Sequence, residues 1–161
     1  LEKNLTRINE NTKIVKEETE NIINKAPQDK NYKVLIIMAT TKSIGARTSD
    51  TTIGEMFKDL YTINIADTSN ETLSLKNFSM EKIIEEDPDF IFVQTMGSDL
   101  EAIQERLNSE VESNPAWSSL SAVKNNRYIA LPKDLYTYKA NNRYAEAYEN
   151  LAKILYPEVF K

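Results

Sequence analysis

The stretch YKVLIIMA, residues 32–39, decides the fold of this chain. It is an almost continuous apolar run with β-branched side chains, which is the pattern of a strand buried on both faces. The segment FIFV, residues 90–93, predicts a second strand of the same kind. Such strands are typical of parallel sheets, so we expect helices to cover this sheet on both sides.

The segments around these strands have the periodicity of amphipathic helices. Apolar side chains recur at helical spacing in residues 1–25, 53–61, 80–84, 100–111 and 141–156. Helix starts are marked by capping-box spacing at Thr52 with Glu55 and at Ser98 with Glu101, and by Ser79 as a single cap. Trp117 and Leu120 predict a short helical turn.

Shorter segments complete the prediction. Residues 62–66 and 128–131 are expected to be short strands, and residues 40–50, 67–77 and 94–97 are expected to be polar loops. Strands that alternate with helices predict an α/β fold, a three-layer lobe with a mostly parallel central sheet covered by helices on both faces. We assign residues 27–161 to this lobe and residues 1–26 to a helix that leads into it. That helical pattern has no start signal, so we expect a preceding segment.

Composition excludes several kinds of function. The net charge of −5 argues against general nucleic-acid binding, which needs a basic face. The sequence has no Cys and no His, which removes thiol nucleophiles, Ser–His pairs and cysteine zinc sites. Three glycines cannot form a phosphate-binding motif, and no apolar run reaches the roughly 20 residues of a membrane span. We therefore expect no bound metal held by protein ligands and no cofactor.

Candidate ligand contacts follow the predicted strands. In an open parallel sheet, ligands bind at the carboxyl ends of the strands, here residues 40–50, 94–98 and 132–140. These loops carry basic, aromatic and small polar side chains: Lys42, Ser43, Arg47, Met96, Lys133, Tyr136, Tyr138 and Lys139. The last four belong to AVKNNRYIALPKDLYTYK, residues 122–139, which we interpret as a surface for an anionic, partly aromatic ligand.

Individual residues in these loops have more than one interpretation. Arg47 suits planar oxyanions but is also an ordinary surface arginine. Tyr136 and Tyr138 alternate in a predicted extended loop, so we expect one of them to face a ligand. Met96 fits a bulky ligand or a packing gap. Glu55 is either part of a helix cap or an acid that docks onto another protein, and its spacing from Thr52 favours the cap.

Four segments in this order resemble a known family: TTIGEMFKDLYTINIAD, FSMEKIIEEDPDFIFVQ, NPAWSSLSAVKNNRYIALP and YAEAYENLAKILYPEVF. The chain resembles the C-terminal lobe of the substrate-binding lipoproteins of iron(III)-siderophore ABC importers. These belong to the helix-hinged periplasmic binding proteins, which also include binders of cobalamin and haem. The resemblance covers roughly residues 33–157, and residues 1–26 match the end of the interlobe helix.

The resemblance implies extracytoplasmic capture of an Fe(III)-siderophore between two lobes, with delivery to an ABC permease. It implies a cell-surface lipoprotein or periplasmic location and an N-terminal lobe that forms the opposite wall. Arg47 looks like the basic residue that contacts chelate oxygens, Tyr136 like an aromatic cleft residue, and Glu55 like the glutamate that docks onto a permease arginine. Some relatives bind iron through a histidine in this lobe, and this sequence has none. Some place an arginine after the strand, where this sequence reads Gln94, Thr95 and Met96. The resemblance therefore implies an intact chelate.

Two other functions stay open at this point. An enzyme or chelatase-like domain would have to use Lys42, Lys133, Asp134 or Tyr136 as its acid or base. An interaction module would use the amphipathic first helix against a protein partner.

Overall fold

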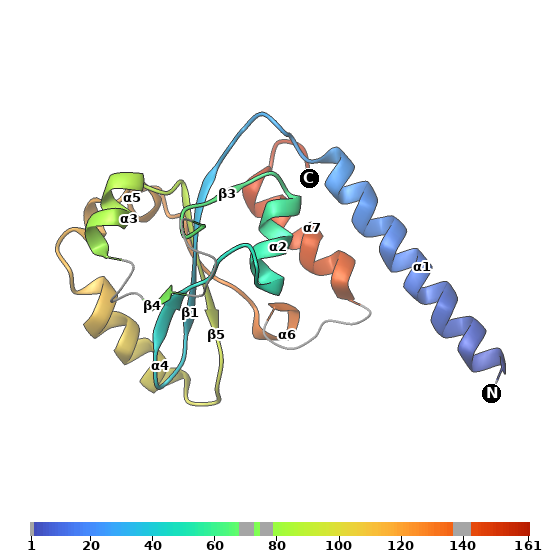
Figure 1. Ribbon diagram of the computed structural model, residues 1–161, viewed down its shortest axis with the longest axis horizontal. Helices are drawn as coiled ribbons and strands as arrows, with labels where there is room; N and C mark the ends of the chain where they lie inside the picture. The colour runs from blue at the N-terminus through green and yellow to red at the C-terminus, as the bar shows by residue number, and fades with distance from the viewer. Residues whose placement is uncertain (1, 68–72, 75–78, 137–142) are drawn as a thin grey trace.

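The computed structural model describes residues 2–67, 73–74, 79–136 and 143–161. They form one six-stranded sheet between two helical layers (Figure 1). The strand order is β4-β2-β1-β5-β6, and β3 also pairs with β1. This confirms the expected α/β class and its layers. No helix in the described ranges is long and apolar enough to cross a membrane.

The centre of the sheet is parallel. Strand β1 (Lys33–Ala39) runs parallel to β5 (Phe90–Thr95), with Val34 opposite Phe90 and Ala39 opposite Thr95. Strand β6 (Tyr128–Ala130) extends the parallel part beyond β5. Strand β3 (Ile63–Asn64) runs parallel to the first two residues of β1.

The other edge of the sheet is antiparallel, which the sequence did not indicate. Strand β2 (Ile44–Ala46) folds back onto β1, and β4 (Leu73–Ser74) pairs with β2. The prediction of loops throughout residues 40–50 and 67–77 is therefore wrong, and the sheet is mixed. Strands of three and two residues among polar neighbours are too short to show a period of two.

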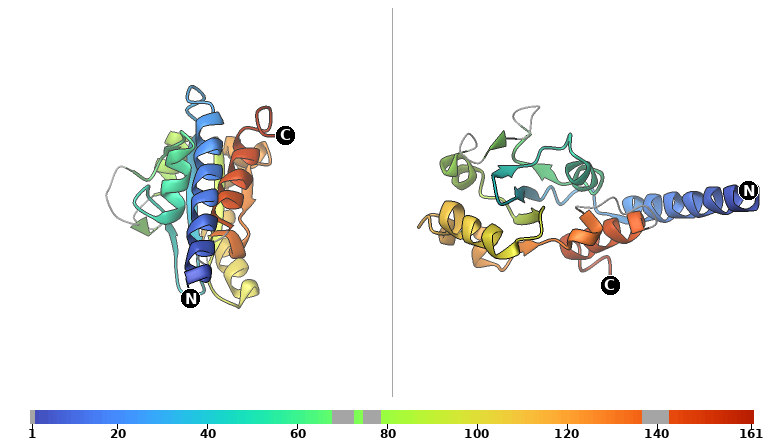
Figure 2. Two further views of the ribbon diagram at one scale, coloured as in Figure 1. Left: turned by 90° about the vertical axis from the view of Figure 1, so that its right-hand side faces the viewer. Right: turned by 90° about the horizontal axis from the view of Figure 1, so that it is seen from below.

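Helices cover both faces. On one face lie α2 (Thr52–Asp59), α6 (Lys133–Tyr136) and α7 (Tyr144–Leu155), and on the other α3 (Met80–Glu86), α4 (Leu100–Leu107) and α5 (Ser121–Lys124) (Figure 1). A π turn (Asn108–Glu112) and a 3₁₀ turn (Trp117–Ser119) connect α4 to α5. The C-terminal part of helix α1 (Glu2–Lys25) lies beside α7, and its N-terminal part extends past the lobe (Figure 2).

Alternation along β1 divides the interior into two cores. Val34 and Ile36 pack with Phe57, Phe92 and the apolar face of α7. Leu35, Ile37 and Ala39 pack with the opposite core, to which α3 contributes Ile83, α4 Ile103 and Leu107, and the 3₁₀ turn Trp117. All strand residues from Val34 to Ala39 are buried, as the sequence predicted.

Helix starts differ from the predicted ones by one residue. Thr51, not Thr52, caps α2 by accepting a hydrogen bond from the Gly54 N–H, and Asp99, not Ser98, caps α4. Only the cap at Ser79 is as predicted. Adjacent residues of capping type compete, and the backbone entering the helix decides between them.

Two helices bury fewer side chains than their apolar patterns predict. Ile84 and Leu100 belong to the apolar patterns of residues 80–84 and 100–111 but are exposed by 40% and 56%. Both lie on short helices, where one buried side chain per turn anchors the helix. Leu100 is therefore a large apolar side chain at the surface of the lobe.

We predict that Gly54→Ala destabilises the fold. A Cβ atom at position 54 would lie 1.9 Å from the Thr48 carbonyl oxygen, which is backbone and cannot rotate away. Such overpacking costs about 1–3 kcal/mol, more than the roughly 1 kcal/mol that alanine gains over glycine in a helix. Urea unfolding measures the change. The exposed α2 variant Lys58→Ala is the control, and equal stability of both variants would contradict the prediction.

A second prediction concerns acid stability. Asp87 ends α3 in the left-handed conformation, and its carboxylate accepts hydrogen bonds from the Ser121 hydroxyl at 2.5 Å and N–H at 3.0 Å. These bonds lower the pKa of Asp87 below its ordinary value. Because the folded-state pKa is depressed, this stabilisation is present at neutral pH and is lost as the pH falls through it.

The variant Asp87→Asn keeps a residue that tolerates the left-handed conformation and removes the charge. We expect it to be less stable than the wild type at pH 7, with a difference that shrinks as the pH falls below about 4. Unfolding at a series of pH values checks this, with Glu20→Gln on α1 as control. A difference that is independent of pH would refute the assignment.

Candidate functional site

The carboxyl ends of the parallel strands β1, β5 and β6 lie side by side, at Ala39, Thr95 and Ala130, and together form the carboxyl edge of the sheet. The N-terminus of α2 and the short helix α6 lie beside this edge on one face. Ligands of open α/β sheets bind at such an edge. The predicted site residues can be located relative to it.

A hollow of about 180 Å³ lies where β1, β5, α2 and α6 meet. We call it the Arg47 hollow; its lining residues are Met38, Arg47, Thr51, Thr52, Ile53, Gln94, Met96 and Tyr136. Three of the predicted ligand residues, Arg47, Met96 and Tyr136, are brought together here. None of the lining residues is an aspartate or a glutamate.

Arg47 is held by its backbone and not by an ion pair. Its N–H donates to the Ile36 carbonyl at 2.8 Å, and its carbonyl accepts from Asn64 Nδ2 at 2.8 Å. The side chain is half-buried, and Nε is buried without a hydrogen-bond partner. Burial lowers the pKa of Arg47. Within the described ranges, no carboxylate forms a salt bridge with this guanidinium.

The first turn of α2 adds to the positive potential of the hollow. Thr51, Thr52 and Ile53 at the start of this eight-residue helix line the hollow. The N-terminus of a helix carries a partial positive charge because its first N–H groups have no partner within the helix. The guanidinium and the helix end both favour an anionic group at this place.

Tyr136 is placed differently from the prediction. It lies on α6 instead of in an extended loop, and only 8% of it is exposed. Its hydroxyl donates to the Ala147 carbonyl at 2.8 Å and accepts from Asn150 Nδ2 at 3.0 Å. Burial raises its pKa to about 12. Its ring therefore forms part of the wall of the Arg47 hollow, while its hydroxyl is hydrogen-bonded to α7.

Gln94 is a positioning residue that sequence reasoning missed. It was predicted to begin a loop, but β5 continues through Thr95, and Gln94 is buried. Its side-chain amide donates to the Tyr136 carbonyl at 2.7 Å and so fixes α6 beside the hollow. A polar residue at the end of an apolar strand is the signal that could have identified it.

The remaining predicted residues lie elsewhere. Lys42 and Ser43 are exposed in the turn after β1, where Thr40 Oγ1 accepts from both of their N–H groups, and neither lines the Arg47 hollow. Tyr138 lies outside the described residues. Glu55 is exposed in the first turn of α2, and the cap at Thr51 removes the capping role proposed for it.

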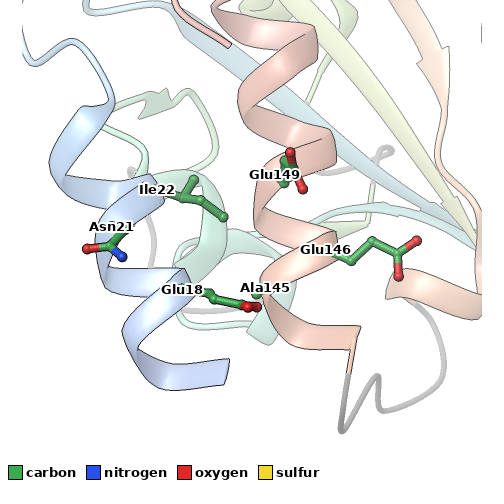
Figure 3. Close-up of a pocket in the computed structure, with 6 residues that line it drawn as sticks. All are labelled: Glu18, Asn21, Ile22, Ala145, Glu146 and Glu149. Atoms are coloured by element: carbon green, nitrogen blue, oxygen red, sulfur yellow. The ribbon is translucent and has the colours of Figure 1, made fainter. Parts of the chain in front are cut away.

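A second hollow, formed by α1 and α7, is acidic (Figure 3). Its lining residues are Glu18, Asn21, Ile22, Ala145, Glu146 and Glu149. The carboxylate of Glu18 points toward Ala145, whereas that of Glu146 points away from α1 (Figure 3) and pairs with Arg143. No carboxylate cluster suited to a metal ion occurs in the described part of the chain. Like charges make this hollow unsuitable for an anion.

The sheet and its edge define an α/β lobe with a small basic recess at the carboxyl ends of its parallel strands. Residues 7–135 match the family described as periplasmic binding protein. The chain belongs to this family. Its members are binding proteins and not enzymes, so the alternative of an enzyme is not supported.

Two curated relatives come from Bacillus subtilis (strain 168). The Fe(3+)-citrate-binding protein YfmC is 27% identical over 111 residues, which are 69% of this chain and 32% of that protein. The uncharacterized ABC transporter substrate-binding lipoprotein YvrC is 28% identical over 134 residues, 83% of this chain and 38% of that protein. This chain thus spans about a third of the length of these relatives.

Solved structures agree with the fold. S. aureus IsdE complexed with heme superposes with a TM-score of 0.79 at 26% identity, covering 92% of this chain and 57% of that chain. A substrate-binding protein of an ABC transporter from Listeria monocytogenes EGD-e gives 0.72 at 27% identity, with coverages of 94% and 57%. The architecture is that of a lobe of such binding proteins.

Proposed function

We propose that this chain is a lobe of the extracytoplasmic solute-binding component of an ABC importer. The importer takes up a ferric siderophore or a similar metal chelate. The single observation that carries the proposal is the half-buried guanidinium of Arg47, whose Nε has no partner, in a recess at the ligand-binding edge of the sheet.

The ligand chemistry follows from that recess. Oxygen-rich chelates of iron(III) present carboxylate, catecholate or hydroxamate oxygens, which accept hydrogen bonds from guanidinium groups. The whole sequence has no His or Cys that could bind the metal directly. An intact chelate, held through its own oxygens, therefore fits this lobe better than a bare ion. The relatives named for Fe(3+)-citrate and heme support a metal chelate as the broader class.

A second lobe is part of the proposal. The Arg47 hollow is open and measures about 180 Å³, less than the roughly 300–1,000 Å³ of typical ligand pockets. Another wall is needed to enclose a chelate. Residues 1–26 act in this proposal as the end of an interlobe helix, which is supported by the way α1 continues beyond the lobe (Figure 2). An N-terminal lobe of the same protein supplies the opposite wall.

The partner and the location follow from the same role. In an importer the loaded protein docks onto a permease outside the cytoplasmic membrane, as a cell-surface lipoprotein or in the periplasm. Glu55 is the docking residue that we propose for this lobe. It is exposed at the start of α2, and the helix cap at Thr51 leaves its carboxylate free of a capping role.

We predict that Arg47→Gln in the two-lobed protein weakens ferric chelate binding about tenfold to a hundredfold. This is the loss expected when a charged hydrogen bond worth roughly 1.5–3 kcal/mol is removed. Calorimetric titration with ferric citrate and a ferric tricatecholate measures it. The control Lys124→Gln removes one positive charge at the opposite edge of the sheet. Unchanged affinity in Arg47→Gln would overturn the proposal.

We predict that Glu55→Gln lowers uptake of the chelate by cells several-fold and leaves its affinity for the purified protein unchanged. An exposed docking charge contributes to association with the permease and not to the ligand site. Radioactive iron uptake and calorimetry check the two quantities. Glu105→Gln, exposed on α4, is the matched control. Uptake equal to the wild type, or a parallel loss of affinity, would contradict the docking role.

A further inference from the structure

A third hollow opens at the same edge of the sheet but on the opposite face, and its walls are mostly apolar. It measures about 310 Å³. We call it the apolar groove; its lining residues are Thr95, Leu100, Ile103, Gln104, Leu107, Ala130, Leu131 and Lys133. No carboxylate lines it.

The groove has a buried floor and an exposed wall. Ile103, Leu107 and Leu131 are almost fully buried, whereas Leu100 is 56% exposed. Leu100 is the first residue of α4, and its side chain has no place in the core beneath. An exposed leucine above a floor of buried leucine and isoleucine gives an apolar ligand segment two surfaces to contact.

The groove and the Arg47 hollow share no lining residue and lie on opposite faces of the sheet, on either side of the end of β5. Consecutive residues of β5 line the two sites, Gln94 the Arg47 hollow and Thr95 the groove. Helix α6 also serves both, with Tyr136 on one side and Lys133 on the other. Lys133 Nζ donates to the Gly97 carbonyl, which ties α6 to the turn after β5. A ligand that lies across the end of this strand would contact both sites.

We propose that the ligand is amphiphilic: its oxygen-rich head lies at Arg47 and an aliphatic segment lies in the apolar groove against Leu100. This inference rests on the proposed function and specifies the substrate class for the same edge. The Arg47 hollow offers a guanidinium to the oxygen-rich head, and the groove offers a separate apolar surface to the aliphatic segment at the same edge of the sheet. The Lys133 amino group keeps the groove compatible with a ligand whose net charge is negative.

A matched pair of chelates tests this in the two-lobed protein. One is a hexadentate ferric tricatecholate with a terminal acetyl group, and the other is the same chelate with an octanoyl chain. The iron-binding head and the charge are identical, so only the aliphatic segment differs. We expect the octanoyl chelate to bind the wild type about fifteen- to sixtyfold more tightly, as burial of two or three methylene groups predicts.

The variant Leu100→Gln should remove most of this difference and leave the affinity for the acetyl chelate unchanged. Leu100→Met, which stays apolar, should retain it. Ile84→Gln changes another exposed aliphatic side chain, which lies on α3, and should have no effect on either chelate.

The outcomes separate the two proposals. Equal affinity of the wild type for both chelates, or an equal loss for both in Leu100→Gln, overturns the amphiphilic ligand and leaves the chelate-binding function intact. Failure of both chelates and of ferric citrate to bind, with no effect of Arg47→Gln, overturns the proposed function and this inference with it.

Discussion

The structure depends on one strand that is buried on both faces and bonded on both edges. Side chains of β1 alternate between two cores, so a shift of one residue in its pairing would exchange every side chain between them. This fixed register also positions the site. The backbone N–H of Arg47 donates a hydrogen bond to the Ile36 carbonyl. The pairing of β2 with β1 therefore determines how far the arginine lies from the carboxyl ends of the strands.

The parts of the fold that the sequence predicts are those with long, regular apolar patterns. The strands β1 and β5 and the helices α2 and α7 each bury three or more side chains, and their periods can be recognised in the sequence alone. The parts that it misses, β2, β4 and α6, have two to four residues. The conformation of β2 and β4 is decided by what they pack against, and no local pattern encodes it. Pro132 followed by Asp134 was a helix-start signal for α6 that the predicted loop overlooked.

The site shows the same division. Arg47, Met96 and Tyr136 were predicted because they follow buried strands, and they line one recess. Their exact roles depend on the missed elements. Strand β2 brings Arg47 back from the turn at Lys42 and Ser43, and α6 turns the Tyr136 hydroxyl toward α7. The sequence does not identify the partner of Gln94, because this partner is a backbone carbonyl of α6, 42 positions away in the sequence.

The distribution of charge connects the two recesses to one ligand. The chain is acidic, with 25 Asp and Glu against 20 Lys and Arg, yet no carboxylate lines the Arg47 hollow or the apolar groove. Three glutamates line the hollow between α1 and α7 instead. A carboxylate beside Arg47 would offset the cost of its burial, because a buried charge without a partner is unfavourable. Without one, the guanidinium stays available to an anionic head, while the adjoining groove offers no charge that would repel it.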